Sequence, residues 1–200
     1  MTRVAAVILA GGRGERLGGV IKADLTIGGM RLLDRVAAVL AGADALLVAR
    51  GSLDLDLPRG AIGVADLPTD YAGPLGGLAA AVDWVRQQQE RPDILVLAPV
   101  DTPFLPPDYL ALLAAPLATA PVAVAAFAGQ PYPTSSAWWL AAITDLPDAV
   151  RAGTAPHSLK RLAESLGAVP VDFPPRAGGD PFANANTPEE LRALERRAAS

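Results

Sequence analysis

Short apolar runs recur along the chain and are almost uninterrupted by polar residues. Val4–Leu9, Ala45–Ala49 and residues 94–98 are the clearest of them. A strand with one face in water alternates apolar and polar positions, whereas a strand covered on both faces does not. Segments with helical patterns separate these runs, as the crossover connections of parallel strands require. The sequence therefore predicts an α/β fold whose mostly parallel sheet carries helices on both faces.

The remaining elements continue this alternation. Further strands are expected at residues 62–65, 122–127 and 135–140, with the last one antiparallel to the strand before it. Helices are expected at residues 32–40, 74–88, 107–113, 157–166 and 188–199. The prolines and glycines fall mainly in the connections, and neither a repeat nor a linker interrupts the pattern. Residues 1–200 are therefore predicted to form a single domain.

Composition and charge exclude several classes of protein. The formal net charge of −4 argues against a protein that coats nucleic acid. The chain has no cysteine, which excludes disulfides and thiolate metal sites. Its first apolar run is too short for a membrane span or a signal-peptide core, so we expect a soluble, cytoplasmic protein without membrane partners. Residues 1–35 carry six basic and three acidic side chains, which suits a small anionic ligand.

A glycine-rich loop directly follows the first predicted strand. Five glycines fall among residues 11–19, and they let the backbone turn tightly and bring its N–H groups close to phosphate oxygens. Arg13, Arg16 and Lys22 can neutralise the charge of a triphosphate. The loop therefore predicts a site for a nucleoside triphosphate. The alternative is a flexible turn between a strand and a helix.

The loop differs from the two common phosphate-binding loops. Gly14 and Gly19 have the spacing of a Walker loop, but Val20 and Ile21 stand where that loop needs lysine and a hydroxyl residue. The dinucleotide fingerprint needs a third glycine at the position of Leu17. Both classes of site are therefore excluded.

Four segments in order carry a specific resemblance. Residues 9–19 read Leu-Ala-Gly-Gly-Arg-Gly-Glu-Arg-Leu-Gly-Gly and are followed by Lys22. Residues 66–68 (Asp-Leu-Pro) lead to residues 73–77 (Gly-Pro-Leu-Gly-Gly), and residues 99–105 read Pro-Val-Asp-Thr-Pro-Phe-Leu. Residues 180–191 contain Phe-Ala-Asn-Ala-Asn-Thr-Pro-Glu-Glu-Leu. This set, which spans nearly the whole chain, resembles the molybdenum cofactor guanylyltransferase family. The double glycine after alanine favours the guanylyl branch over the cytidylyl branch.

The resemblance implies a fold and a set of site residues. The family belongs to the wider sugar-nucleotide and cofactor nucleotidyltransferases, which have a Rossmann-like fold of the nucleotide-diphospho-sugar transferase type. It implies that Asp66 lies by the guanosine, that Asp101 holds Mg²⁺, and that Asn184 and Asn186 lie beside the acceptor or the metal. The predicted nucleotide-binding residues are Leu9, Ala10, Gly11, Gly12, Arg13, Lys22, Asp66, Gly76 and Asp101. The predicted catalytic residues are Lys22, Arg16 and Asp101.

The residues themselves support part of this assignment. Asp101 follows the apolar run at 94–98, at the strand end where α/β proteins bind ligands. One carboxylate with phosphate oxygens and waters is the usual way in which proteins hold Mg²⁺. The alternative for Asp101 is a turn or a helix cap, and that for residues 73–77 is close packing of a helix on the sheet. Asn184 and Asn186 point the same way along an extended loop. Their alternative is capping of the last helix, a role that the residues from Thr187 to Glu190 can themselves fill.

The sequence departs from the family pattern at two places. Arg50 stands where the family usually has an asparagine near the guanine, which leaves base recognition open. Tyr132-Pro133-Thr134 replaces a His-Pro segment, which leaves the substrate contact there open. His157 is interpreted as a residue at a helix N-terminus, and the pair Trp138-Trp139 as half core and half surface.

The expected reaction is transfer of GMP from GTP to the terminal phosphate of the molybdenum cofactor, with release of pyrophosphate. A phosphate nucleophile is ionised near neutral pH, so alignment and charge neutralisation suffice without a strong base. Molybdoenzyme apoproteins or cofactor-biosynthesis proteins are the candidate protein partners. The alternatives are cytidylyl or other nucleotidyl transfer, a different small phosphorylated acceptor, and a nucleotide-binding partner protein without catalysis.

Overall fold

The computed structural model describes residues 2–14, 17–71, 73–176 and 178–199. Its centre is a seven-stranded sheet in the order β11-β9-β10-β8-β1-β6-β7. Three strands, β1 (Val4–Leu9), β6 (Ala45–Ala49) and β9 (Val122–Phe127), have the bounds that the apolar runs predict. The others are β7 (Ile62–Val64), β8 (Ile94–Pro99), β10 (Gln130–Trp139) and β11 (Val169–Asp172).

The strand directions confirm a mostly parallel sheet. β1 pairs in parallel with β6 and β8, β6 with β7, and β9 with β11. β10 is antiparallel to both β8 and β9, as expected for the strand after β9. Leu9 pairs with Ala49 and with Pro99, and Ala49 pairs with Val64, so four parallel strands end at one edge. The loops that leave this edge carry most of the predicted site residues.

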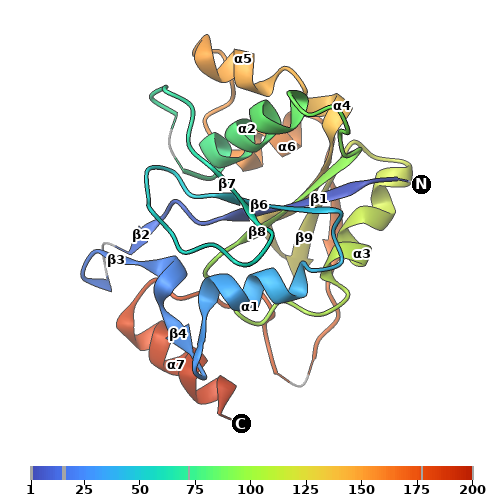
Figure 1. Ribbon diagram of the computed structural model, residues 1–200. Helices are drawn as coiled ribbons and strands as arrows, with labels where there is room; N and C mark the ends of the chain where they lie inside the picture. Colours follow the sequence, from blue (N-terminus) through green and yellow to red (C-terminus); the bar gives the residue numbers. More distant parts are fainter. Residues whose placement is uncertain (1, 15–16, 72, 177, 200) are drawn as a thin grey trace.

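Helices cover both faces of the sheet, as predicted. In Figure 1, α2 (Gly73–Arg86), α5 (Leu146–Arg151) and α6 (Leu159–Ser165) lie above the sheet, while α1 (Leu32–Val39) and α7 (Pro188–Ala198) lie below it. Two further short helices are α3 (Tyr109–Ala114) and α4 (Leu140–Ile143).

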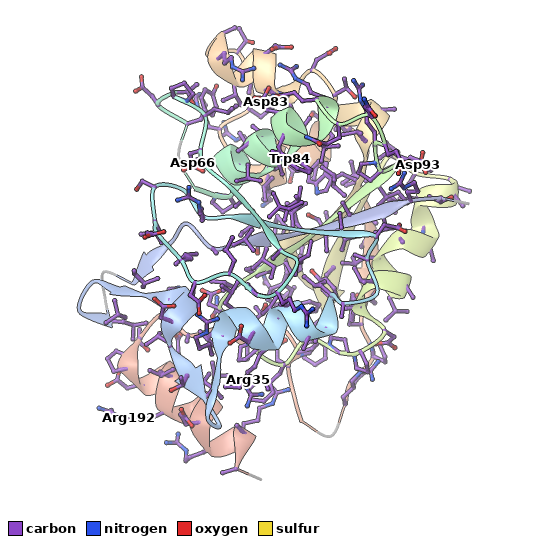
Figure 2. The ribbon with its side chains drawn as sticks, viewed as in Figure 1. Arg35, Asp66, Asp83, Trp84, Asp93 and Arg192 are labelled. Atoms are coloured by element: carbon purple, nitrogen blue, oxygen red, sulfur yellow. The ribbon has the colours of Figure 1, made fainter. Side chains whose placement is uncertain are left out.

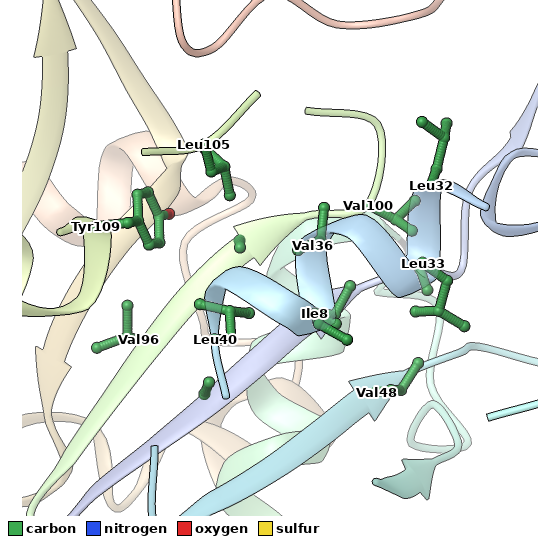
Figure 3. Close-up of a cluster of buried hydrophobic side chains, with 14 of the residues drawn as sticks. Ile8, Leu32, Leu33, Val36, Leu40, Val48, Val96, Val100, Leu105 and Tyr109 are labelled. Atoms are coloured by element: carbon green, nitrogen blue, oxygen red, sulfur yellow. The ribbon is translucent and has the colours of Figure 1, made fainter. Parts of the chain in front are cut away.

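Each sheet face has its own hydrophobic core. Along β1, Ala6 and Ile8 belong to the core under α1, whereas Ala5 and Val7 belong to the core under α2. All four are at most 1% exposed, which explains why β1 shows no polar alternation. The core under α1 is drawn in Figure 3, where Ile8 and Val48 lie beneath the helix.

Some elements differ from the sequence prediction. The helix expected from residue 157 begins at Leu159, because Ser158 is extended and its side chain accepts a hydrogen bond from the Arg161 N–H. The helix expected from residue 107 begins at Tyr109, after a turn in which Tyr109 donates to Pro106 O. The strand β11 and the helices α4 and α5 were not predicted. β11 lies at the sheet edge and contains Pro170, which weakens its strand pattern.

The segment after β1 forms small hairpins rather than a long helix. β2 (Arg13–Gly14) pairs with β3 (Val20–Ile21), and β4 (Thr26–Ile27) pairs with β5 (Met30–Arg31). A single 3₁₀ turn, Lys22–Asp24, joins the two hairpins. Among the described residues, no helix is long and apolar enough to cross a membrane.

Candidate active site

A pocket of about 270 Å³ opens at the edge where β1, β6, β7 and β8 end. Its walls come from the glycine-rich loop, the ends of β6 and β8, the start of α2, β10 and the loop before α7. Seven of the predicted site residues line it: Leu9, Gly11, Gly12, Lys22, Asp66, Asp101 and Asn184. The predicted residues thus line a pocket at the carboxyl ends of the strands, which is where α/β proteins bind ligands.

The glycine-rich loop is held by backbone contacts. Ala10 is fully buried, and its N–H donates to Ala49 O at 2.8 Å. Ala10 therefore anchors the loop to β6 and does not line the pocket. A Cβ on Gly11 would lie 3.2 Å from Gly51 N, so the loop needs a residue without a side chain there. Gly12 is exposed and has open space around it.

The side chains of Arg13 and Arg16, two predicted cations of this loop, lie outside the part of the chain that the structure describes. The Arg13 backbone pairs with Ile21 in the small hairpin. Arg16 lies outside the described residues. Their roles in neutralising a triphosphate remain predictions.

Lys22, Asp101 and Asn186 meet at the centre of the site. Lys22 Nζ lies 2.6 Å from Asp101 Oδ2 and 2.6 Å from Asn186 Oδ1. The side chains of Lys22 and Asp101 are only 13% and 15% exposed. The three residues come from the 3₁₀ turn after β3, from the end of β8, and from the loop before α7. A charge pair of this burial is held by geometry and by the added amide oxygen, because water can screen little of it.

The loop before α7 is fixed at both ends. Ala185 N–H donates to Asp101 O at 3.3 Å. Thr187 caps α7 by accepting from the Glu190 N–H at 3.2 Å, and Glu190 Oε2 accepts from the N–H groups of Thr187 and Asn186. The capping box therefore uses Thr187 and Glu190, as the sequence indicated, and the alternative that the asparagine side chains cap α7 does not hold. The asparagine side chains are left to the site: Asn184 lines the pocket and Asn186 binds Lys22.

Asp66 forms the rim of the pocket beyond β7. Figure 2 labels Asp66 beside the connection from β7 to α2, at the opposite edge of the sheet from Asp93. The residue is exposed, but partial burial of its carboxyl against the pocket wall raises its pKa above the ordinary value of 3.8. Gly51, at φ +60°, leaves room for this carboxylate, because a Cβ there would lie 3.3 Å from Asp66 Oδ2.

The glycines at the start of α2 have two different roles. Gly77 lines the pocket together with Gly73 and Pro74. Gly76 is buried beside them, and a Cβ on it would lie 2.9 Å from Tyr71 O. Close packing thus explains Gly76, while the pocket wall is made by its neighbours. A contact of Gly76 with nucleotide remains a prediction.

The oxygen donors of the site fit a divalent metal ion shared with a nucleotide. Among the described residues, no three histidine, cysteine, aspartate or glutamate side chains gather to hold a metal by themselves. Asp101 offers one carboxylate, the amide oxygen of Asn186 shares Lys22 Nζ with it, and Asn184 lines the same pocket. Mg²⁺ commonly takes one or two carboxylates and completes its shell with substrate phosphates and waters. The donor set therefore suits a metal that arrives with its nucleotide.

Comparison with known families agrees with this geometry. Residues 6–173 match the family described as the MobA-like NTP transferase domain. The chain belongs to this family of nucleotidyltransferases. The molybdenum cofactor guanylyltransferase of Rhodobacter capsulatus is 36% identical over 199 residues, covering 98% of this chain and 96% of that protein. That of Rhodopseudomonas palustris strain HaA2 is 35% identical over 198 residues, covering 95% of this chain and 90% of that protein.

Solved structures share the fold of this NTP transferase domain. Molybdopterin-guanine dinucleotide biosynthesis protein A from Archaeoglobus fulgidus superposes with a TM-score of 0.72 at 20% identity, covering 98% of each chain. The 2-C-methyl-D-erythritol 4-phosphate cytidylyltransferase from Thermus thermophilus gives 0.68 at 20% identity over 97% of this chain and 98% of the other. Rv0371c from Mycobacterium tuberculosis, solved in complex with manganese, gives 0.66 at 19% identity over 98% of each chain.

Arg50 does not line the pocket of this NTP transferase domain. Its Nη1 donates to Leu53 O, and Gly63 makes room for its side chain, since a Cβ there would lie 3.2 Å from Arg50 Nε. The guanidinium is thereby turned onto the loop after β6. The departure from the family asparagine removes an amide from this position without filling the pocket with a cation.

Tyr132 and Thr134, the other departure, separate in the structure. Tyr132 is engaged with the loop before α7, where its hydroxyl donates to Asp180 Oδ2 at 2.9 Å and its ring stacks on Phe182 at 4.6 Å. Thr134 lines the pocket instead. The sequence pattern marked this segment as a substrate contact without showing which of its residues faces the site.

The remaining residues singled out in the sequence lie away from the pocket. His157 is exposed and stacks on Tyr71, with ring centroids 5.6 Å apart, just before α6. Trp138 is fully buried and Trp139 is half-buried, as expected for a pair divided between core and surface. The pocket residues that sequence reasoning did not name include Ala49, Gly77 and Thr134. Ala49 was detectable as a strand end, but the other two depend on the packing of α2 and β10.

Proposed function

We propose that the chain transfers GMP from GTP to the terminal phosphate of the molybdenum cofactor, releasing pyrophosphate. The observation that carries this proposal is the junction of Lys22, Asp101 and Asn186, at which Nζ lies 2.6 Å from both oxygens. It joins the loop expected to bind the triphosphate to the segment expected to bind the acceptor. A site built this way serves to align two phosphorylated reactants. The names of the curated relatives support guanylyl transfer in particular.

The two reactants are assigned to the two sides of β8. The glycine-rich loop after β1, Ala49 at the end of β6, and Asp66 after β7 lie on one side of it in the sheet order. β10 lies on the other side, and Thr134 comes from it. Asp101 ends the dividing strand, and Asn184 comes from the loop that binds it. GTP is proposed to occupy the β1–β6–β7 side and the cofactor the β10 side.

The chemistry needs charge neutralisation more than proton transfer. An oxygen of the acceptor phosphate attacks the α-phosphorus of GTP, a new P–O bond forms, and the bond to the bridging oxygen of the leaving pyrophosphate breaks. No histidine or cysteine is among the described residues that line the pocket, which fits a nucleophile that is already ionised. The backbone N–H groups of Gly11 and Gly12 would approach the phosphates. Lys22 would stabilise the negative charge that develops on the leaving pyrophosphate.

Mg²⁺ is the metal that we propose for this site. Asp101 would hold it, with Asn184 and Asn186 near enough to orient its waters. When bound, it supplies positive charge to the phosphate oxygens. Because Lys22 Nζ contacts Asp101 Oδ2, a metal held by Asp101 would compete with the lysine, and a displaced lysine would be free to contact the triphosphate.

The setting of the reaction is also a proposal. Residues 1–200 would act as one domain, since the loop before α7 joins the same site as β1. The reaction would take place in the cytoplasm, and molybdoenzyme apoproteins or other cofactor-biosynthesis proteins would receive the product. The family to which the chain belongs supports these assignments.

Thermal unfolding with GTP, CTP, ATP and UTP, each with Mg²⁺, tests the nucleotide assignment. A ligand at 100 times its Kd stabilises a protein by about 2.7 kcal/mol, which raises Tm by roughly 5 °C for a domain of this size. We expect GTP alone to give this shift. Incubation with GTP and molybdopterin should then yield the guanine dinucleotide and pyrophosphate. A shift with CTP alone would indicate cytidylyl transfer, and no product from any nucleotide would reject the enzymatic function.

A further inference from the structure

Strand β10 contains an irregular segment next to the pocket. Tyr132 pairs with Ala125 of β9, and the next pair along the ladder is Ser136 with Val124. Residues 133–135 thus have no paired position in β9. Bulges of this kind redirect a side chain that would otherwise follow the regular alternation of the strand. Thr134, in the middle of the segment, lines the pocket.

Buried hydrogen bonds hold this irregular segment in place. Ser136 Oγ donates to Pro133 O at 2.8 Å, and Trp138 Nε1 donates to Ser136 Oγ at 2.8 Å. Ser136 and Trp138 are both fully buried. Pro133 has no N–H to offer to a ladder, so it favours the irregular geometry. The position of Thr134 is therefore set by the core beneath it.

Tyr132, on the same strand, makes its contacts outside the pocket. Tyr132 binds Asp180 and stacks on Phe182, so its hydroxyl is used to hold the loop before α7. Thr134 and Asn184 are left as the polar side chains that the β10 side of the described pocket presents. A hydroxyl can donate a hydrogen bond to an anionic oxygen, and Lys22 in the same pocket lining supplies positive charge for such a ligand.

We propose that the Thr134 hydroxyl donates a hydrogen bond to the terminal phosphate of the acceptor. Two observations support this contact: Thr134 comes from the strand across β8 from the glycine-rich loop, and Thr134 is among the residues that line the pocket. The contact would orient the attacking phosphate towards Asp101 and Lys22. The inference rests on the proposed function and adds a specificity-determining residue to its acceptor side.

Thr134→Val and Thr134→Ser form a matched pair for the test. Valine keeps the β-branched shape that strands favour and removes the hydroxyl, whereas serine keeps the hydroxyl. A hydrogen bond to a charged group is worth a factor of about 10 to 100 in affinity. We expect Thr134→Val to raise KM for molybdopterin by this factor at saturating GTP, with the GTP-induced thermal shift unchanged. Thr134→Ser should restore a KM near that of the wild type.

The possible outcomes separate the contact from the function. An unchanged molybdopterin KM in a folded Thr134→Val protein overturns the proposal, as does a loss that falls on GTP binding instead. Equilibrium titration of molybdopterin with wild type and Thr134→Val, without nucleotide, gives the same comparison if turnover is slow or uses CTP. A wild-type protein that binds molybdopterin without forming product would reject the proposed function alone. A wild type that does not bind molybdopterin would reject both.

Discussion

Lys22 Nζ lies 2.6 Å from Asp101 Oδ2, and both side chains are largely buried. The lysine follows the glycine-rich loop, and the aspartate follows β8, so the contact joins segments that are 79 residues apart. Each charge neutralises the other in the protein described here. We propose that a cation at Asp101 and an anion at Lys22 compete with this ion pair, which would couple metal binding to triphosphate binding.

Replacing Asp101 with asparagine should abolish most turnover. Removing one group that stabilises charge in a transition state costs about 10²- to 10³-fold in rate. The ammonium of Lys22 would keep amide oxygens as partners but lose its counter-charge, so we expect a loss of about 1–3 kcal/mol in the free energy of unfolding. Steady-state kinetics and urea unfolding measure the two effects. Asp172→Asn, at an exposed aspartate of β11, is the control, and wild-type turnover in Asp101→Asn would contradict the metal assignment.

Removing the lysine should affect metal and nucleotide in opposite directions. Lys22→Met leaves Asp101 without its competing cation, so Mn²⁺ alone should bind about tenfold more tightly, a change of about 1.4 kcal/mol. The same variant should bind GTP about 10- to 100-fold more weakly, because it lacks a charged donor. Electron paramagnetic resonance of free Mn²⁺ and calorimetry with GTP give both constants.

The only other lysine in the sequence supplies the control for this experiment. Lys160 is 66% exposed on α6, and Lys160→Met changes the net charge by the same amount. It should alter neither constant. Mn²⁺ affinity that is equal in Lys22→Met and Lys160→Met would show that the ion pair does not compete with the metal.

The sheet was predictable because burial on both faces leaves a plain signature. β1, β6 and β9 have the predicted bounds, since every position in them is apolar and nearly all of them pack in one of the two cores. β11 was not predicted, because its burial alternates along only four residues and Pro170 interrupts its pattern. Local sequence patterns therefore identify strands that are buried on both faces, and they miss a short edge strand that is held mainly by its pairing with a neighbour.

The site was predictable only in part. Leu9 ends β1, and Gly11 and Asp101 come just after β1 and β8, so their gathering follows from the neighbouring ends of parallel strands. The pair of Lys22 and Asp101 depends on where the small hairpins place the lysine, which no local pattern specifies. Thr134 reaches the pocket because of an irregular segment that buried hydrogen bonds maintain. Such contacts arise from packing between distant segments.

Tyr132→Phe should weaken the attachment of the loop before α7 to β10, while the aromatic ring at position 132 still stacks on Phe182. The lost hydrogen bond to Asp180 should cost about 1 kcal/mol of stability. Asp180 also accepts from Phe182 N–H at 2.8 Å, and its carbonyl accepts from Arg197 at 2.6 Å, so the loop should stay folded. We expect KM for molybdopterin to rise while kcat changes little. A fall in kcat alone would show that Tyr132 acts on the chemical step instead.

The same tyrosine should give the protein a distinctive alkaline pH dependence. Burial and the Asp180 carboxylate raise the pKa of Tyr132 to about 12. Between its ordinary pKa of 10 and this value, the unfolded chain ionises the residue and the folded protein does not, so stability declines as pH rises. Tyr132→Phe lacks this contribution. The stability difference between wild type and variant should be constant below pH 10 and shrink from pH 10 to 12 in urea unfolding experiments, and a constant difference would contradict the assignment.

Asp66→Asn should stabilise the nucleotide-free protein and weaken GTP binding. Burial raises the pKa of this carboxyl in the folded protein, so its ionised form is disfavoured by folding at neutral pH. As pH falls through the raised pKa, the folded protein takes up the proton first and this cost disappears. The gain in Tm from Asp66→Asn should therefore be largest near pH 7 and fade towards pH 4. The exposed Asp70→Asn, in the same loop, should show no such gain.

Replacing Arg50 with alanine should leave the choice of nucleotide unchanged. Its guanidinium binds Leu53 O and lies outside the pocket lining, so the base should be recognised by other groups. The lost hydrogen bond should lower the free energy of unfolding by about 1 kcal/mol. Thermal shifts with GTP and CTP would measure the preference, with the exposed Arg59→Ala as the control for the loss of one positive charge. A change in the GTP-to-CTP preference of tenfold or more in Arg50→Ala alone would show that this side chain turns into the pocket when the nucleotide binds.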